Sequence, residues 1–77
     1  MITLALDWEK EEFDFKDVNF TSNAICYNFF FKERDGLQWP ILEVTFTSLQ
    51  KCFNFLNSFY GVKNLDEMEE VIELYRI

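Results

Sequence analysis

The sequence predicts an α+β fold, in which a small antiparallel sheet is covered on one face by two carboxy-terminal helices. Residues 2–47 contain runs that alternate apolar and polar side chains, as strands do, and an Asp-Gly pair separates two of these runs. Residues 48–76 instead repeat apolar side chains at helical spacing. Because 77 residues suffice for one core and 49% of them are hydrophobic, we expect a single folded domain over residues 1–77.

Three to four strands are expected in the first part of the chain. Alternation of apolar and less apolar residues at the amino terminus predicts a strand over 2–8. Two phenylalanines between charged residues predict a short strand over 12–16, although an extended edge segment would show the same pattern. The clearest strand is 24–33, a run of strong β-formers whose first face carries Ile25, Tyr27, Phe29 and Phe31.

An Asp-Gly pair after this run predicts a hairpin. Asp35 and Gly36 favour the positive backbone angles of a tight turn, so the return strand is expected over 37–47. Pro40 has no N–H group, and we therefore expect regular pairing to begin at Ile41. Beyond it, Leu42, Val44 and Phe46 share one face, which fits a sheet covered on one side.

Two helices are expected after the sheet. The first spans 48–60, with Ser48 or Thr47 as its cap and Gly61 as its stop. Its apolar positions follow helical spacing: Leu49, Cys52, Phe53, Leu56 and Phe59. The second spans 64–76, with Asn64 as its cap and acidic residues in its first turn. Residues 71–77 are also rich in β-formers, and pairing of the last residues at the sheet edge is the alternative.

The composition excludes several classes of function. Seven Lys and Arg against 14 Asp and Glu give a net charge of −7, which disfavours direct binding to nucleic acid or to an anionic membrane. The chain has no His and only two Gly, so it lacks imidazole catalysis, His-ligated metal sites and glycine-rich phosphate loops. No stretch approaches the ~20 apolar residues of a membrane-spanning helix, and no export signal is visible, so we expect a cytoplasmic protein.

The remaining reactive residues do not form a recognisable catalytic pattern. Cys26 and Cys52 lack CxxC spacing and a His partner, so we expect both to be reduced and partly buried. The acidic stretches lack the spacing and the central Gly of an EF-hand. Glycosidase chemistry needs a substrate cleft between two carboxyl groups, which a domain this small rarely encloses. We therefore expect no enzyme activity, no metal site and no cofactor.

The acidic residues gather in two clusters. The first contains Asp7, Glu9, Glu11, Glu12, Asp14 and Asp17, and in an extended segment alternate members form a row of charges at roughly 6.6 Å spacing. The second contains Asp66, Glu67, Glu69, Glu70 and Glu73. Three of these, Asp66, Glu70 and Glu73, share one helical face. Each cluster also has a plain explanation, because charges deter edge-to-edge strand pairing and acids complement a helix amino terminus.

This composition fits a protein that binds a basic protein surface better than it fits a catalyst. We expect an inhibitor that occupies the nucleic-acid-binding groove of a nuclease-like enzyme, its carboxylates standing where phosphates would. The expected contact residues are Asp7, Glu9, Glu11, Glu12, Asp14, Asp66, Glu69, Glu70, Glu73 and Trp39. In size, charge and composition the chain resembles the small acidic proteins that phages use against host defence, such as anti-CRISPR proteins, and the resemblance includes no motif.

A second class of function is a structural or regulatory interaction module, such as a homodimer or the small subunit of a complex. If the Ile25 face of strand 24–33 fills the core, other aromatics remain outside it as an interface: Phe30 and Trp39, or Phe55 and Tyr60. The alternative is that this small domain uses its aromatics only to fill the core. The two functions differ in their response to salt, because screening weakens an acidic interface and leaves an apolar one almost unchanged.

Overall fold

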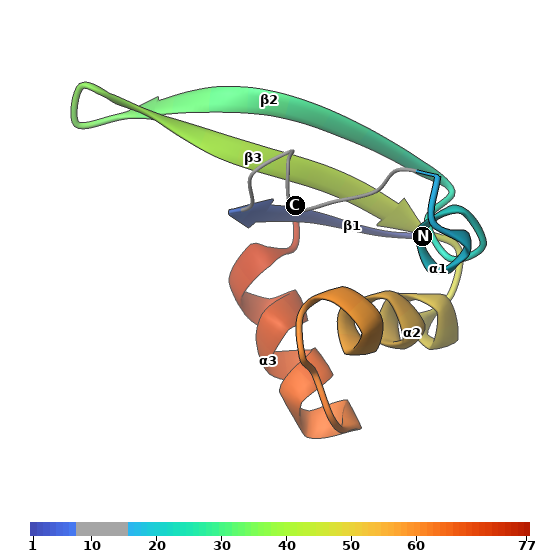
Figure 1. The fold of residues 1–77 in the computed structure, drawn as a ribbon. Helices are drawn as coiled ribbons and strands as arrows, with labels where there is room; N and C mark the ends of the chain where they lie inside the picture. Colours follow the sequence, from blue (N-terminus) through green and yellow to red (C-terminus); the bar gives the residue numbers. More distant parts are fainter. Residues whose placement is uncertain (8–15) are drawn as a thin grey trace.

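The computed structural model describes residues 1–7 and 16–77, apart from the side chain of Asn19, and shows a sheet with helices packed on one face (Figure 1). Two long helices, α2 (Leu49–Phe59) and α3 (Leu65–Tyr75), cover that face. The strands form one antiparallel sheet in the order β1-β3-β2: β1 (Ile2–Asp7), β2 (Cys26–Arg34) and β3 (Leu37–Phe46). The predicted α+β fold is therefore confirmed.

Most predicted boundaries agree with the structure to within two residues, and the differences have local causes. The strand expected over 12–16 lies outside the described residues except for Lys16, which is in a turn. A short helix, α1 (Val18–Thr21), was not expected. It is a single turn in which the carbonyl oxygen of Asp17 accepts hydrogen bonds from the N–H groups of Phe20 (3.0 Å) and Thr21 (2.9 Å). One turn is too short to show helical periodicity in a sequence.

The two long helices are capped as the sequence predicts. The Ser48 side chain accepts a hydrogen bond from the Lys51 N–H (3.2 Å), and the Asn64 side chain accepts one from the Glu67 N–H (2.9 Å). At the carboxy-terminal end of α3, the structure contains part of each alternative, the helix and the pairing at the sheet edge. The helix continues to Tyr75, and Arg76 then forms an isolated antiparallel bridge with Leu4 of β1.

The hairpin between β2 and β3 closes through the turn that the Asp-Gly pair predicts. Asp35 (φ 51°) and Gly36 (φ 78°) both have positive φ, as a type I′ turn requires. Pairing runs from Arg34–Leu37 onward, so the expectation that regular pairing begins at Ile41 was wrong. Pro40 is tolerated because β1 pairs with β3 only from Ile41, which leaves Pro40 with a neighbouring strand on one side.

The core lies between the sheet and the helices. From β3, Leu42, Val44 and Phe46 are buried as predicted, and β1 contributes Ile2, Leu4 and Leu6. The helices contribute Cys52, Phe55 and Leu56 from α2 and Met68 and Val71 from α3. Phe55 is fully buried, which contradicts its expected place outside the core, because α2 turns it toward the rings of Phe46 (5.2 Å between centroids) and Phe20 (5.3 Å). Leu49, expected on the buried stripe, is exposed.

Candidate protein-binding surfaces

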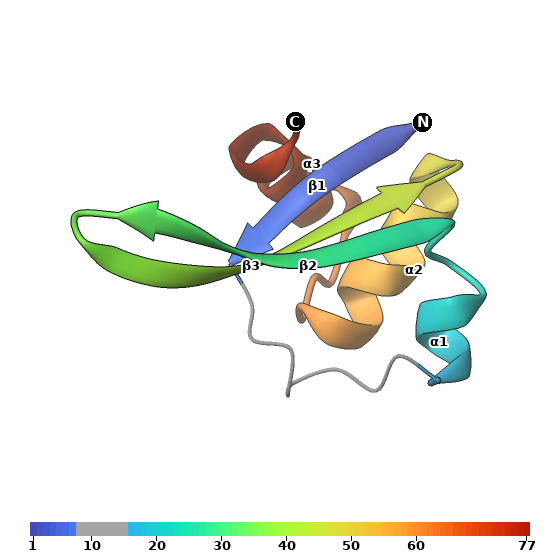
Figure 2. The same ribbon diagram turned by 90° about the horizontal axis from the view of Figure 1, so that it is seen from above.

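The outer half of the β2–β3 hairpin extends beyond the rest of the sheet, as Figure 2 shows from above. The register explains this projection, since the last residue of β1, Asp7, pairs with Ile41, and the ten-residue β3 continues beyond that point. Residues 31–40, here called the outer ribbon, therefore have no third strand beside them within the described part of the chain. Three of its apolar side chains are exposed to solvent: Phe31 (61%), Leu37 (61%) and Trp39 (43%).

Among the described strands, β2 lies at one edge of the sheet, and most of its side chains are exposed. Ile25, just before it, is 55% exposed and Tyr27 is 49% exposed, so the face with Ile25, Tyr27 and Phe31 does not fill the core. The cause is the position of the helices. Because α3 contacts β1 and α2 contacts β3, β2 extends beyond the part of the sheet that the two helices cover. The ring of Phe20 meets Tyr27 edge-on at 5.0 Å, and Phe29 is half-buried.

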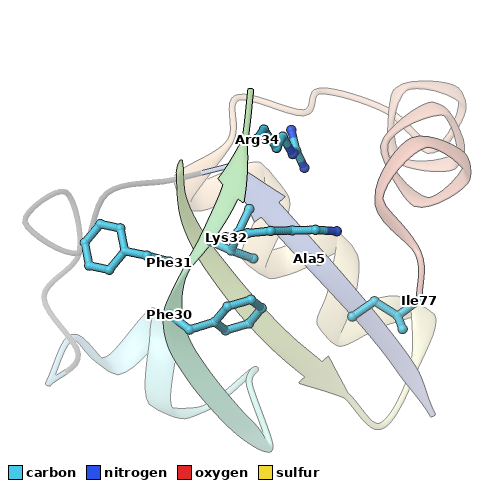
Figure 3. Close-up of a pocket in the computed structure, with 7 residues that line it drawn as sticks. Ala5, Phe30, Phe31, Lys32, Arg34 and Ile77 are labelled. Carbon is cyan, nitrogen blue, oxygen red and sulfur yellow. The ribbon is translucent and has the colours of Figure 1, made fainter. Parts of the chain in front are cut away.

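The face of the sheet opposite the helices, here called the open face, carries a shallow groove of about 410 Å³. Figure 3 shows Lys32 lying across the sheet, with Phe30 and Ile77 on the same side. Arg34 forms an ion pair with Asp7 (3.7 Å). By strand register Glu43 is also on this face, which therefore carries carboxylates as well as cations.

The predicted acidic residues lie in separate places. Asp7 ends β1 and is paired with Arg34, whereas Glu9, Glu11, Glu12 and Asp14 lie outside the described residues. Asp66, Glu69, Glu70 and Glu73 are exposed on α3, and none has an ion pair with another described residue. Trp39 is on the outer ribbon, whereas α3 lies beneath β1, so the structure does not bring Trp39 and the α3 acids together (Figure 1).

Two buried or half-buried groups, one in α2 and one directly after it, have altered acidity. Cys52 is fully buried, and burial raises its thiol pKa to about 11. Burial, followed by the hydrogen bond to the Tyr75 hydroxyl (3.4 Å), raises the pKa of Tyr60 to about 12. Cys26 is exposed on β2, so the expectation that both cysteines are partly buried was wrong. Tyr60, expected as an exposed aromatic, instead packs its ring against that of Tyr75.

Two general features of the described residues bear on function. Among residues 1–7 and 16–77, no group of three or more Cys, Asp or Glu side chains is arranged to hold a metal ion. In those same ranges, no helix has the length and apolar character needed to cross a membrane.

Sequence reasoning missed Tyr27, Phe31 and Leu37 as members of an exposed surface. One signal was present, because the strands predicted on either side of Asp35-Gly36 are longer than the strand predicted at the amino terminus. A shorter third strand leaves part of a long hairpin unpaired.

Comparison with family models, curated proteins and solved structures gave no match for this chain. Its function is therefore argued from its own surfaces.

Proposed function

We propose that this protein is a protein-binding module, and that its main contact surface consists of the outer edge of β2 together with the outer ribbon. The observation that carries this proposal is the exposure of large apolar side chains on both faces of one hairpin: Ile25, Tyr27 and Phe31 on the helix side, and Leu37 and Trp39 on the open face. Single exposed apolar residues are normal on a protein surface, whereas several of them gathered on one projecting hairpin are typical of an interface.

The backbone of β2 supports the same proposal. An edge strand presents unpaired N–H and C=O groups, and natural proteins usually shield such an edge with charges, proline or a bulge. In β2 the charged residues are confined to its last three positions, Lys32 to Arg34, and the preceding six positions are uncharged. Charge therefore does not oppose contact between this part of β2 and an apolar partner surface.

Affinity capture with three versions of the protein tests this proposal. Immobilised wild-type protein, Phe31→Lys and Leu74→Lys are compared for the proteins that they retain from a lysate of the source cells. Phe31 is 61% exposed on the outer ribbon and Leu74 is 76% exposed on α3, so both variants add one positive charge at an exposed apolar site. We expect partners retained by the wild type and by Leu74→Lys to be lost by Phe31→Lys. Identical retention by all three proteins would contradict the proposal.

The acidic inhibitor is a second candidate, and α3 provides the observation that favours it. Its four exposed carboxylates have no ion pair within the described ranges, so their charge is available to a partner. Asp66, Glu70 and Glu73 lie on one side of the helix, about one turn or ~5.4 Å apart. We propose that this acidic side would enter the basic groove of a nucleic-acid-binding enzyme. Opposite charges would speed association with such a partner.

Charge reversal on α3 tests the second candidate. The triple variant Asp66→Lys, Glu69→Lys and Glu70→Lys should lose a basic partner that Phe31→Lys still retains. Because Asp66 lies in the first turn of α3, where acids stabilise the helix, the neutral triple variant Glu69→Gln, Glu70→Gln and Glu73→Gln serves as the second test. Circular dichroism checks that each variant is folded. Undiminished binding of the basic partner by both triple variants would rule out the α3 surface.

A further inference from the structure

A second groove, of about 240 Å³, lies between α2 and α3, which contact each other beneath the sheet (Figure 1). It is formed by residues near the start of each helix, and six side chains line it: Leu49, Gln50, Phe53, Leu65, Met68 and Glu69. Leu49 is 58% exposed and Leu65 is 62% exposed, whereas Met68 is buried. The groove therefore presents apolar surface from both helices to the solvent.

Helical spacing explains the exposed wall on α2. The buried residues of α2 are Cys52, Phe55 and Leu56. Leu49 and Phe53 are four residues apart, so they form a row of their own beside this buried stripe. The apolar surface of α2 is thus wider than the part that the core buries, and the remainder faces the groove.

The α3 wall of the groove has a negative rim. Glu69 lines the groove, with Glu73 four residues after it and Asp66 three residues before it, so the three carboxylates are neighbours on the helix surface. None of them forms an ion pair with another described residue. Among the described residues that line the groove, none is Lys or Arg. Such a groove is complementary to an apolar surface with a positive border.

We propose that this groove binds an amphipathic helix of a partner protein, whose apolar stripe is bordered by Lys or Arg residues. The apolar stripe covers Leu49 and Leu65, and the cations face the carboxylates beside Glu69. The site lies apart from the outer ribbon and so goes beyond the proposed function (Figure 1). It also differs from the second candidate, in which the α3 carboxylates act without an apolar anchor.

The walls of the groove favour a helix as the occupant. Both walls are capped helices, and neither presents the row of unpaired backbone N–H and C=O groups that an added strand needs. A segment bound between them must satisfy its own backbone groups, as a helix does. Its apolar residues at i, i+3 or i+4 and i+7 then serve as the anchors.

The size and charge of the groove narrow the occupant further. Its volume of about 240 Å³ is below the ~300–1,000 Å³ of a typical small-molecule site, so it suits side chains of a protein partner. Opposite charge orients the partner helix and speeds its association, and burial of Leu49 and Leu65 slows its dissociation. The net charge of −7 repels an acidic helix.

Fluorescence anisotropy with a synthetic peptide tests the groove directly. The probe is a labelled peptide of about 18 residues, long enough to form a helix, with Leu at i, i+3, i+4 and i+7 and Lys beside this stripe. One control peptide has Glu in place of Lys, and the other has the same composition in scrambled order. We expect the probe to bind the wild-type protein at least about tenfold more tightly than either control peptide does.

Matched substitutions separate the apolar and the ionic parts of the site. Leu65→Gln removes an exposed apolar side chain from the groove and should weaken probe binding at least about tenfold. Leu74→Gln makes the same change at a 76% exposed position on the opposite side of α3 and should bind as the wild type does. Glu69→Gln should weaken binding about threefold, whereas Glu33→Gln removes the same charge from the exposed end of β2 and should not. Circular dichroism checks that each variant is folded.

Nuclear magnetic resonance locates the bound peptide. The chain has two methionines: Met68 lines the groove, whereas Met1 is 84% exposed and is not part of the lining. Isotope-labelled methionine methyl groups therefore give two signals, and Met68→Leu, a substitution that cores tolerate, assigns them. We expect the Met68 signal to shift as probe is added. An unchanged Met68 signal at saturating probe would place the peptide elsewhere and overturn the inference.

The outcomes separate this site from the proposed function. Probe binding no tighter than that of the scrambled peptide up to millimolar concentration, or binding that Leu65→Gln leaves unchanged, would overturn the groove as a helix site. If Phe31→Lys then still loses captured proteins that Leu74→Lys retains, binding through the outer ribbon stands without the groove. Conversely, probe binding that Leu65→Gln loses and Phe31→Lys keeps supports the groove whatever the outer ribbon binds.

Discussion

At the scale of single residues, the two cysteines show how burial decides chemistry. Cys26 is exposed, whereas Cys52 is fully buried with its pKa raised to about 11. At pH 8 only about one Cys52 thiol in a thousand is the reactive thiolate, and burial also blocks its access to a reagent. We predict that a disulfide reagent modifies one thiol rapidly and the second at least about 100-fold more slowly. Unfolding in urea should remove the difference, and equal rates in the native protein would contradict it.

Cys52 and Tyr60 also set the response of stability to alkaline pH. Their pKa values are raised from 9.0 to about 11 and from 10.0 to about 12, so the folded state holds both protons more tightly than the unfolded state. Their stabilisation is therefore complete below pH 9 and is lost as the pH rises toward 12. We predict that the urea midpoint falls over this range. The variant Cys52→Ala should begin to lose stability at a higher pH than the wild type, and a midpoint independent of pH would contradict the prediction.

At the scale of elements, the start of α3 depends on a side-chain cap. Asn64 accepts the Glu67 N–H (2.9 Å), and the Glu67 carboxylate accepts the Lys63 N–H (2.6 Å). Asn64→Ala leaves the first of these N–H groups without its acceptor, and we predict a loss of about 1 kcal/mol in the free energy of unfolding. Asn64→Ser keeps an acceptor and should cost only a few tenths of a kcal/mol. Urea denaturation measures both, and equal stabilities for Ala and Ser would show that the cap contributes nothing.

Elements with local signals were predictable, and those determined by long-range packing were not. The caps at Ser48 and Asn64 and the turn at Asp35-Gly36 depend on residues within one turn of each other. The exposure of Tyr27 and Phe31 depends on which strands the helices cover, and no local pattern contains that information. The alternation in β2 correctly showed which side chains share a face and wrongly suggested that this face is buried.

The same distinction applies to the candidate site. The side-by-side position of the α3 carboxylates follows from helical spacing and was predictable. The separation of Trp39 from those carboxylates follows from the sheet order β1-β3-β2, with α3 against β1 and the outer ribbon beyond the end of β1. Sequence alone does not specify strand order. No local sequence pattern could therefore show whether Trp39 and the α3 carboxylates lie on the same surface.

At the scale of the whole molecule, two unlike surfaces lie at opposite edges of one sheet. The acidic side of α3 lies under β1, and the aromatic edge belongs to β2. A single contact surface that used both would have to surround the domain. The protein is therefore better described by two independent surfaces, one governed by charge and the other by apolar burial.

Salt should act differently on these two surfaces. Raising the ionic strength from about 0.1 M to about 1 M shortens the screening length from about 10 Å to about 3 Å. A basic partner held by the α3 carboxylates should then bind at least tenfold more weakly. The affinity of a partner held by the exposed apolar side chains of the outer ribbon should change less than about threefold, because screening leaves apolar burial almost unchanged. Affinity capture at both salt concentrations measures the two effects. A partner that Phe31→Lys loses and that also binds tenfold more weakly in high salt would show that ionic contacts, rather than apolar burial, hold it to the outer ribbon.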